Sequence, residues 1–252
     1  MTDFKDHFSK QASAYAAYRP TYPEALYEHL AGLTQTHDLA WDCATGNGQA
    51  AVALAKYYKQ VMATDASESQ LQHAAKLPSI TYQAVPAEQG PLADNSADLV
   101  TVAQAVHWFK IDDFFTEVQR VLKPGGIIAI WGYTRTRATG VEGIDSIIRH
   151  YTKHTLANYW PPEVRLLNES YINIPFPFKE LRAPKLQIEE EWTLDQLMGY
   201  LYSWSATQNY IEANGENPLD KVRDLIARRW GGETETRPVN FKLHFRIGRK
   251  EE

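Results

Sequence analysis

Residues 39–55 constrain the fold of this chain more than any other stretch of its sequence. Residues 39–44 are short and mostly apolar, which is typical of a buried strand. Residues 45–48 then contain two glycines, and the Ala-rich run from Gln49 onwards predicts a helix. A strand, a glycine turn and a helix in this order place a helix N-terminus over the carboxyl end of a strand. Ligands of open α/β sheets bind at that edge, so the sequence predicts a binding site there.

The acidic residue before the turn indicates the charge of the ligand. The motif Gly46-x-Gly48-x-x-Ala51 fits the loose dinucleotide pattern. Asp42 lies four residues before Gly46, however, where a pyrophosphate would meet a nearby anion. A carboxylate there favours a cofactor with a cationic end, and S-adenosylmethionine carries an ammonium and a sulfonium but no phosphate. The alternative for Asp42 is a helix cap or a turn residue.

A second acidic residue points to a nucleoside. Asp65 follows the predicted strand 60–64 and is placed to accept hydrogen bonds from both ribose hydroxyls. An acidic residue performs the same task in nicotinamide enzymes. Asp65 therefore supports a nucleoside cofactor without choosing between the two kinds.

Several further motifs join these residues into one resemblance. They are Asp42-x-Ala44-x-Gly46-x-Gly48, Asp65, Ala87-Glu88, the segment 104–109 (Gln-Ala-Val-His-Trp-Phe) and the turn 122–126 (Leu-Lys-Pro-Gly-Gly). Together they resemble a class I S-adenosylmethionine-dependent methyltransferase, and more narrowly the small-molecule branch (methyltransferase type 11) that includes trans-aconitate methyltransferase-like proteins. The resemblance covers nearly the whole chain. The sequence departs from the family pattern at Ala44, where the family usually has glycine.

The resemblance implies a set of site residues. Cofactor-binding residues would be Tyr18, Arg19, Asp42, Ala44, Gly46, Asn47, Gly48, Asp65, Ala66, Ala87, Glu88 and Gln104. Trp108, Trp131 and Ser205 would contact the substrate, His107 would be the catalytic residue, and no metal would be needed.

The order of elements predicts the fold class. Strands expected at 39–44, 60–64, 80–85, 98–103 and 127–131 alternate with helices, which indicates a parallel sheet covered on both faces. Residues 239–247 alternate apolar and polar side chains, as a strand with one exposed face does. The family has an antiparallel last strand at this place. The expected fold is therefore an α/β, Rossmann-like, mostly parallel seven-stranded sheet with helices on both faces, an antiparallel last strand and a helical cap.

Local signals predict the remaining elements. Helices are expected at 3–17, 24–33, 67–76, from 193 and from 217 to about 230, and a strand at 185–192. Ser67 with Gln70, and Thr193 with Gln196, have the spacing of capping boxes.

We expect one methyltransferase domain over residues 1–252. Residues 1–23 would form a lid over the cofactor, or an aromatic staple that holds the N-terminal arm to the core. Residues 133–184 and 193–230 would form the cap or insertion over the site.

The reaction expected from the resemblance needs mainly alignment, because the methyl group of a sulfonium is already activated. His107 would serve as a general base if the acceptor is a hydroxyl or an amine, and a carboxylate acceptor would need no base. Trp108 would face the sulfonium through a cation–π contact or would pack in the core. Arginines in or near the expected cap are candidates for a carboxylate clamp: Arg135, Arg137, Arg165 and Arg182.

Composition narrows the partners. The 252 residues carry a net charge of −5 and no basic run, which argues against nucleic acid. The single cysteine, Cys43, excludes a disulfide framework, and no apolar run is long enough for a membrane span. With a polar N-terminus that does not look like a signal peptide, we expect a cytoplasmic protein acting on a small-molecule acceptor. The pattern leaves the oligomeric state open.

Two other function classes remain at this point. One is an NAD-dependent oxidoreductase, against which Asp42 and the lack of a Tyr-x-x-x-Lys pattern argue. The other is a non-catalytic S-adenosylmethionine-binding protein, which a sealed acceptor cavity would favour.

Overall fold

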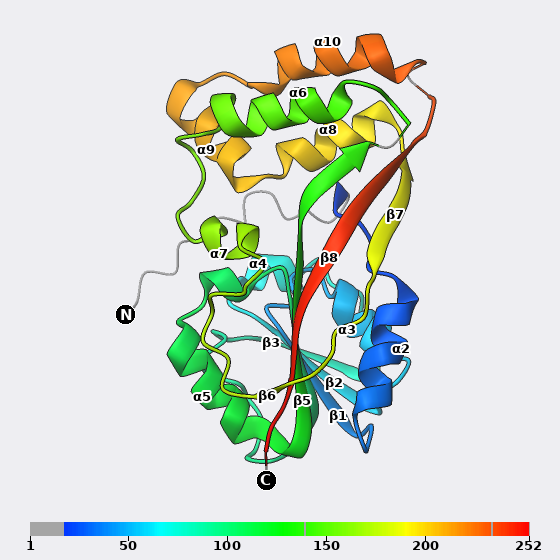
Figure 1. The fold of residues 1–252 in the computed structure, drawn as a ribbon. Helices are drawn as coiled ribbons and strands as arrows, with labels where there is room; N and C mark the ends of the chain where they lie inside the picture. Colours follow the sequence, from blue (N-terminus) through cyan, green and yellow to red (C-terminus); the bar gives the residue numbers. More distant parts are fainter. Residues whose placement is uncertain (1–17, 139, 233, 252) are drawn as a thin grey trace.

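A computed structural model of the chain describes residues 18–138, 140–232 and 234–251, and the helix expected at 3–17 lies outside them. Within these residues one sheet forms the centre of the molecule (Figure 1). Its strands are β1 (Leu39–Cys43), β2 (Gln60–Asp65), β3 (Ile80–Ala84), β4 (Ala97–Ala103), β5 (Leu122–Ala138), β6 (Lys179–Glu180), β7 (Gln187–Trp192) and β8 (Arg237–Arg249). Their order is β3-β2-β1-β4-β5-β8-β6, and β7 also pairs with β8.

The directions of the strands confirm the predicted fold class. β1 to β5 are parallel, and β8 runs antiparallel to β5, β6 and β7. The sheet has eight strands where seven were expected. The additional strand, β6, is only two residues long, too short to produce a pattern of alternation in the sequence.

Helices cover both faces of the parallel strands. The helices are α2 (Glu24–Leu33), α3 (Gln49–Leu54), α4 (Glu68–Leu71) and α5 (Ile111–Val121). In Figure 1, α2 and α3 lie on one side of the sheet and α5 on the other. Alternate β5 residues belong to two separate buried clusters, Ile127 with the α2–α3 side and Ile128 with the α5 side. Because both faces are buried, these strands read as continuous apolar runs.

A second group of helices lies beyond the carboxyl ends of the parallel strands. They are α6 (Ile144–His150), a π-helix (Tyr151–Thr155), α7 (Val164–Asn168), α8 (Leu194–Tyr202), α9 (Ser205–Asn214) and α10 (Leu219–Trp230). Figure 1 shows α6, α8, α9 and α10 together at the top, and we call these four helices with the π-helix and α7 the cap.

The boundary of the cap differs from the expected one. The cap was expected to start at residue 133, but Tyr133 still belongs to β5, which continues to Ala138. This extension pairs with residues 239–243 of β8, and β7 pairs with β8 on the other side. Long-range pairing therefore turns a stretch without clear local periodicity into a strand that enters the cap.

One of the two capping boxes is confirmed. At the start of α8, Thr193 and Gln196 make both reciprocal bonds. Ser67 precedes α4 but makes no side-chain cap bond, so that prediction is wrong, and the helix ends at Leu71 instead of Lys76. The Ser67 hydroxyl lies 3.0 Å from the hydroxyl of Ser69 instead.

Candidate functional site

The turn between β1 and α3 has the backbone conformation that its glycines suggested. Gly46 and Gly48 have φ values of +57° and +83°, in the left-handed region. A Cβ on Gly48 would lie 2.5 Å from the hydroxyl oxygen of Tyr82, so a side chain there would displace Tyr82 and also strain the left-handed backbone. Ala44 shares this left-handed conformation, with a φ of +55°.

Ala44→Gly is expected to stabilise the fold. A left-handed conformation costs a non-glycine residue about 1–2 kcal/mol, and glycine loses roughly 0.5–1 kcal/mol more backbone entropy on folding. The net gain in free energy of unfolding should be about 0.5–1 kcal/mol, measured by urea denaturation. Ala53→Gly, inside the helix α3, is the matched control and should destabilise. Equal losses in both variants would contradict the strain at Ala44.

Asp42 is buried beneath the turn, with a side chain that is 1% exposed. Its two carboxylate oxygens accept hydrogen bonds from the hydroxyls of Thr45 and Thr101. Burial raises the pKa of Asp42 to about 6, although both hydroxyls and the backbone of Ala51 act in the opposite direction. The turn thus rests on a carboxylate that is costly to ionise in the free protein.

Asp65 ties the turn to the end of β2. Its Oδ2 accepts from the backbone N–H of Gly46 at 2.9 Å, and its Oδ1 accepts from that of Ser67 at 2.8 Å. These bonds fix Asp65 beside the turn, next to Ala66 and Asn47 of the predicted set. The two carboxylates, Asp42 and Asp65, make this edge of the sheet acidic, which suits a cationic ligand and not a diphosphate.

Gln104 connects the end of β4 to β5. It has a φ of +58°, and its side-chain amide exchanges two hydrogen bonds with the backbone of Tyr133, at 2.9 and 2.8 Å. A buried Ala87 and a half-buried Glu88 follow β3, and Glu88 accepts from the backbone N–H of Lys110. These predicted cofactor residues follow strands β3 and β4, whereas the turn follows β1.

The chain before α2 crosses from the sheet to the cap. The ring of Tyr18 packs so tightly on Gly199 of α8 that a Cβ there would lie 2.5 Å from it. Arg19 donates to the hydroxyl of Tyr133 at 3.3 Å and to the carbonyl of Ser203 at 3.4 Å. Gln49 at the start of α3 donates to the carbonyl of Pro20. Within the described part of this arm, contacts therefore reach the turn, β5 and the cap.

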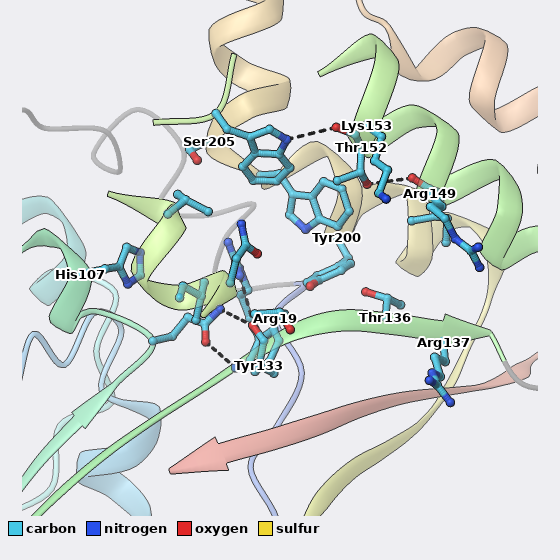
Figure 2. A pocket seen from close by; sticks show the side chains of 18 of the residues that line it. Arg19, His107, Tyr133, Thr136, Arg137, Arg149, Thr152, Lys153, Tyr200 and Ser205 are labelled. Carbon is cyan, nitrogen blue, oxygen red and sulfur yellow. Dashed lines mark hydrogen bonds between the residues drawn. The ribbon is translucent and has the colours of Figure 1, made fainter. Parts of the chain in front are cut away.

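A cavity of about 790 Å³ lies between the sheet edge and the cap (Figure 2). Its lining includes Tyr133, Thr136 and Arg137 of β5, Gln104 directly after β4, and Arg149, Lys153 and Tyr200 of the cap. Trp160 and Trp204, between helices of the cap, also line it. Gln104 and Arg19 belong both to this cavity and to the predicted cofactor residues, so the two sites adjoin.

Positive charge dominates the lining of this cavity. Among the described residues that line it, the cations are Arg19, Arg137, Arg149 and Lys153, and the one carboxylate is Asp145. Asp145 accepts a hydrogen bond from the backbone N–H of Ala138 at 2.9 Å. Figure 2 shows Arg149 and Lys153 on the opposite side of the view from His107. The cavity therefore favours an anionic ligand.

His107 lines the cavity and is 4% exposed. It lies in a short 3-10 helix, Val106–Trp108, and its Nδ1 is 3.1 Å from the hydroxyl oxygen of Tyr171. Burial, together with the charge of Arg19, lowers the pKa of His107 to about 3. His107 is therefore neutral at physiological pH, and a group with so low a pKa is a weak general base.

The predicted substrate residues divide into two groups. Trp108 and Ser205 line the cavity. Trp131 does not: it is fully buried and packs edge-on against Tyr22 and Tyr27, with ring centroids 5.5 and 6.5 Å apart. Its side chain points to the α2 face because the pleat of β5 alternates, so the structure does not bring Trp131 into this cavity.

Of the arginines predicted to clamp a carboxylate, the structure places only some at the cavity. Arg137 lines the cavity, whereas Arg165 is 77% exposed and lies near Glu169, and Arg182 is not part of the lining. For Arg135 the structure describes only the backbone. The sequence reasoning missed Arg149 and Lys153. Asp145, Arg149 and Lys153 follow one another at intervals of four residues. In a helix this spacing places side chains on one face, and it was the signal that could have predicted a shared site.

The described residues offer neither a metal site nor a membrane-spanning helix. Among them, no group of three His, Cys, Asp or Glu side chains is placed to hold a metal ion. None of the helices described is both long and apolar enough to span a bilayer.

Comparison with known proteins shows the family. A sequence profile described as a methyltransferase domain matches residues 41–130. A Dictyostelium discoideum protein that bears the name methyltransferase is 30% identical over 255 residues, covering 99% of this chain and 97% of its own length. An uncharacterized methyltransferase of Mycobacterium tuberculosis is 34% identical over 231 residues, 89% of this chain and 87% of that protein.

Solved structures agree with the sequence comparison. One from Anaeromyxobacter dehalogenans, named as a type II methyltransferase, superimposes with a TM-score of 0.86 and 36% identity, covering 94% of this chain and all of that one. A Haemonchus contortus phosphoethanolamine N-methyltransferase in complex with S-adenosylhomocysteine has a TM-score of 0.51 at 19% identity, which shows a shared fold. It covers 99% of this chain and 59% of that one. The chain therefore belongs to the class I S-adenosylmethionine-dependent methyltransferases.

Proposed function

We propose that this enzyme transfers the methyl group of S-adenosylmethionine to a small-molecule carboxylic acid. The observation that carries the choice of acceptor is the charge of the cavity: its described lining residues include four cations and one carboxylate, which already accepts a backbone hydrogen bond. A charge-assisted hydrogen bond to a carboxylate is shorter and stronger than a neutral one. The cavity also adjoins the predicted cofactor residues, because Arg19 and Gln104 line it, which argues against a protein that only binds the cofactor.

The residues near the turn suit this cofactor. Ala44 and Gly46 have left-handed backbone and are partly exposed, so a ligand can approach the main chain of the turn closely there. Asp42 and Asp65 provide negative charge below and beside it. When bound, S-adenosylmethionine supplies an activated methyl group on a sulfonium. We assign Asp65 to the ribose, Ala87 and Glu88 to the adenine side, and Gln104 and Arg19 to the boundary between cofactor and acceptor.

The remaining tasks of the protein are alignment and exclusion of water. Holding the acceptor in line with the methyl group can contribute roughly 7–11 kcal/mol of the barrier reduction. Trp108 lines the cavity beside His107, with ring centroids 4.7 Å apart, and is placed to wall off a sulfonium. Arg19, which also lines the cavity, provides a cation for the acceptor carboxylate.

Calorimetric titration tests the cofactor, and a turnover panel tests the acceptor. We expect heat of binding with S-adenosylhomocysteine and none with NADH. With S-adenosylmethionine, carboxylic acids should be methylated in preference to amines and phenols of similar size. If the protein binds NADH but not S-adenosylhomocysteine, the proposed cofactor is wrong. If it methylates only amines or phenols, the proposed acceptor class is wrong.

Arg149 and Lys153, two of the cations that line the cavity, should affect binding of the acceptor. Arg149 and Lys153 are exposed, so they act by attracting an anion and not by desolvated contact. In Arg149→Gln/Lys153→Gln we expect the KM for the acid to rise about 3- to 10-fold, kcat to change little and the dependence on salt to weaken. Arg165→Gln is the matched control, because Arg165 lies outside the lining. An unchanged KM in the double variant would contradict the role.

A further inference from the structure

Tyr171 lies beneath His107, on the side of the histidine that bears Nδ1. Tyr171 is fully buried, its ring is stacked on that of His107 at an interplanar angle of 23°, and its hydroxyl oxygen is 3.1 Å from Nδ1. It does not line the cavity, whereas His107 does. The two rings therefore form a fixed pair, with one nitrogen of His107 committed to the phenol.

The last strand of the sheet holds Tyr171 in this place. Ser170 and Tyr171 both adopt left-handed backbone, with φ values of +56° and +60°, which is unfavourable for residues with a Cβ. Arg246 of β8 donates to the carbonyl oxygens of Tyr171 at 2.9 Å and of Ile174 at 3.2 Å, and its guanidinium stacks over Phe176. Strained backbone persists where surrounding contacts determine it, and such positions cluster at functional sites.

The direction of the hydrogen bond follows from the chemistry of the two groups. A neutral imidazole has one N–H and one bare nitrogen. The bare nitrogen accepts a proton with a pKa of ~6.5 in water, so it is a far better acceptor than a phenol oxygen, and the phenol, with a pKa of ~10, is a good donor. The favoured arrangement has Tyr171 donating to Nδ1. The hydrogen of His107 then resides on Nε2, the other nitrogen of the ring.

We propose that Tyr171, held by Arg246, is a positioning residue that fixes the Nε2–H tautomer of His107, so that His107 donates a hydrogen bond to an anionic acceptor and does not act as a base. This inference rests on the proposed function for the identity of the acceptor, but not for the tautomer. Arg19 lines the same cavity as His107. Arg19 and the Nε2–H are then two donors for one carboxylate.

The proton balance of the reaction agrees with this role. A carboxylate oxygen forms its bond to the methyl carbon as the bond from carbon to sulfur breaks, and the electron pair leaves with sulfur. The products are an ester and a neutral thioether, and no proton is removed. A donor that orients the second carboxylate oxygen is therefore useful, whereas a base has nothing to accept.

Nitrogen NMR of the full-length protein tests the tautomer without any acceptor. In protein labelled with [¹⁵N]histidine at pH 7, long-range ¹H–¹⁵N correlations distinguish the Nε2–H form from the Nδ1–H form and from imidazolium. The signals of His107 are assigned as those lost in His107→Gln. We expect the Nε2–H form in the wild type, and a mixture of both tautomers in Tyr171→Phe.

A matched variant separates this role from a general effect of losing a buried hydroxyl. Tyr151 is also buried and its hydroxyl lies 2.9 Å from that of Thr207, so Tyr151→Phe removes a comparable group from the cap. It should leave the His107 signals unchanged. An Nδ1–H tautomer or an imidazolium in the wild type would overturn the proposal, and so would an Nε2–H form that persists in Tyr171→Phe. If Tyr171→Phe does not fold, the wild-type spectrum still decides. If the turnover panel shows no methylation of carboxylic acids, the proposed acceptor class is wrong, but the proposed tautomer of His107 is unaffected.

Discussion

Asp42→Asn is expected to make the folded protein more stable and, at the same time, a poorer binder of S-adenosylhomocysteine. The pKa of Asp42 is about 6 in the fold, raised from ~3.9 in the unfolded chain chiefly by burial. Above pH 6 the folded protein must keep an ionised carboxylate in a dry site. Removing that charge should raise the free energy of unfolding by about 1–3 kcal/mol at pH 7.5. Loss of the negative charge under the turn should weaken cofactor binding at least ~10-fold.

The pH dependence identifies the cause of this gain. Between pH ~4 and 6 the folded state retains the Asp42 proton that the unfolded state releases, so wild-type stability falls as pH rises through this window. The gain of Asp42→Asn should therefore grow from pH 4 to 6 and stay constant above it. Urea denaturation at several pH values and calorimetric titration with S-adenosylhomocysteine measure both effects.

A second buried aspartate serves as the control for Asp42→Asn. Asp98 is 3% exposed, but it lies at the start of β4, at the opposite end from the site. Burial alone would raise the pKa of Asp98, yet the bonds from Lys123, Thr36 and the backbone lower it overall. Asp98→Asn should therefore destabilise the protein and leave cofactor affinity unchanged. A loss of stability in Asp42→Asn with unchanged affinity would contradict the role given to Asp42.

Asp65→Ala is expected to weaken binding of S-adenosylhomocysteine by about 2–3 kcal/mol, or roughly 30- to 150-fold. The substitution removes the assigned partner of the ribose hydroxyls. It also leaves the backbone N–H groups of Gly46 and Ser67 without the oxygens that hold the turn. Calorimetric titration measures the affinity.

The control for Asp65→Ala removes the same charge three residues away. Glu68 is exposed in the first turn of α4, and Glu68→Ala should change the affinity little. If Asp65→Ala binds as tightly as the wild type, Asp65 does not contact the cofactor. If both variants lose affinity equally, the effect is one of net charge and not of the ribose contact.

Much of the sheet could be predicted because its signals are local. The apolar runs of β1, β4 and β5 arise from burial on both faces, and the alternation of residues 239–247 arises from one less buried face. The glycine turn could be recognised because glycine is the residue that adopts left-handed backbone at least cost. The left-handed conformation of Ala44 could not be read in the same way, since alanine carries no such signal.

The cap and the interior of the site depended on contacts between distant segments. Residues 133–138 became a strand through pairing with β8, and Trp131 was directed to the core by the pleat that this pairing continues. His107 could be placed near the reaction by its motif. Its burial and its contact with Tyr171, 64 residues later, could not be foreseen.

The sequence by itself determined the α/β class, the position of the turn and the acidic residues Asp42 and Asp65 around it, because backbone conformation and hydrophobic period depend on neighbouring residues. Only the tertiary structure decided which cations meet in the cavity and which nitrogen of His107 is committed to Tyr171. These depend on the packing of β8 and the cap against the sheet, where burial and charge are set by residues far apart in the chain.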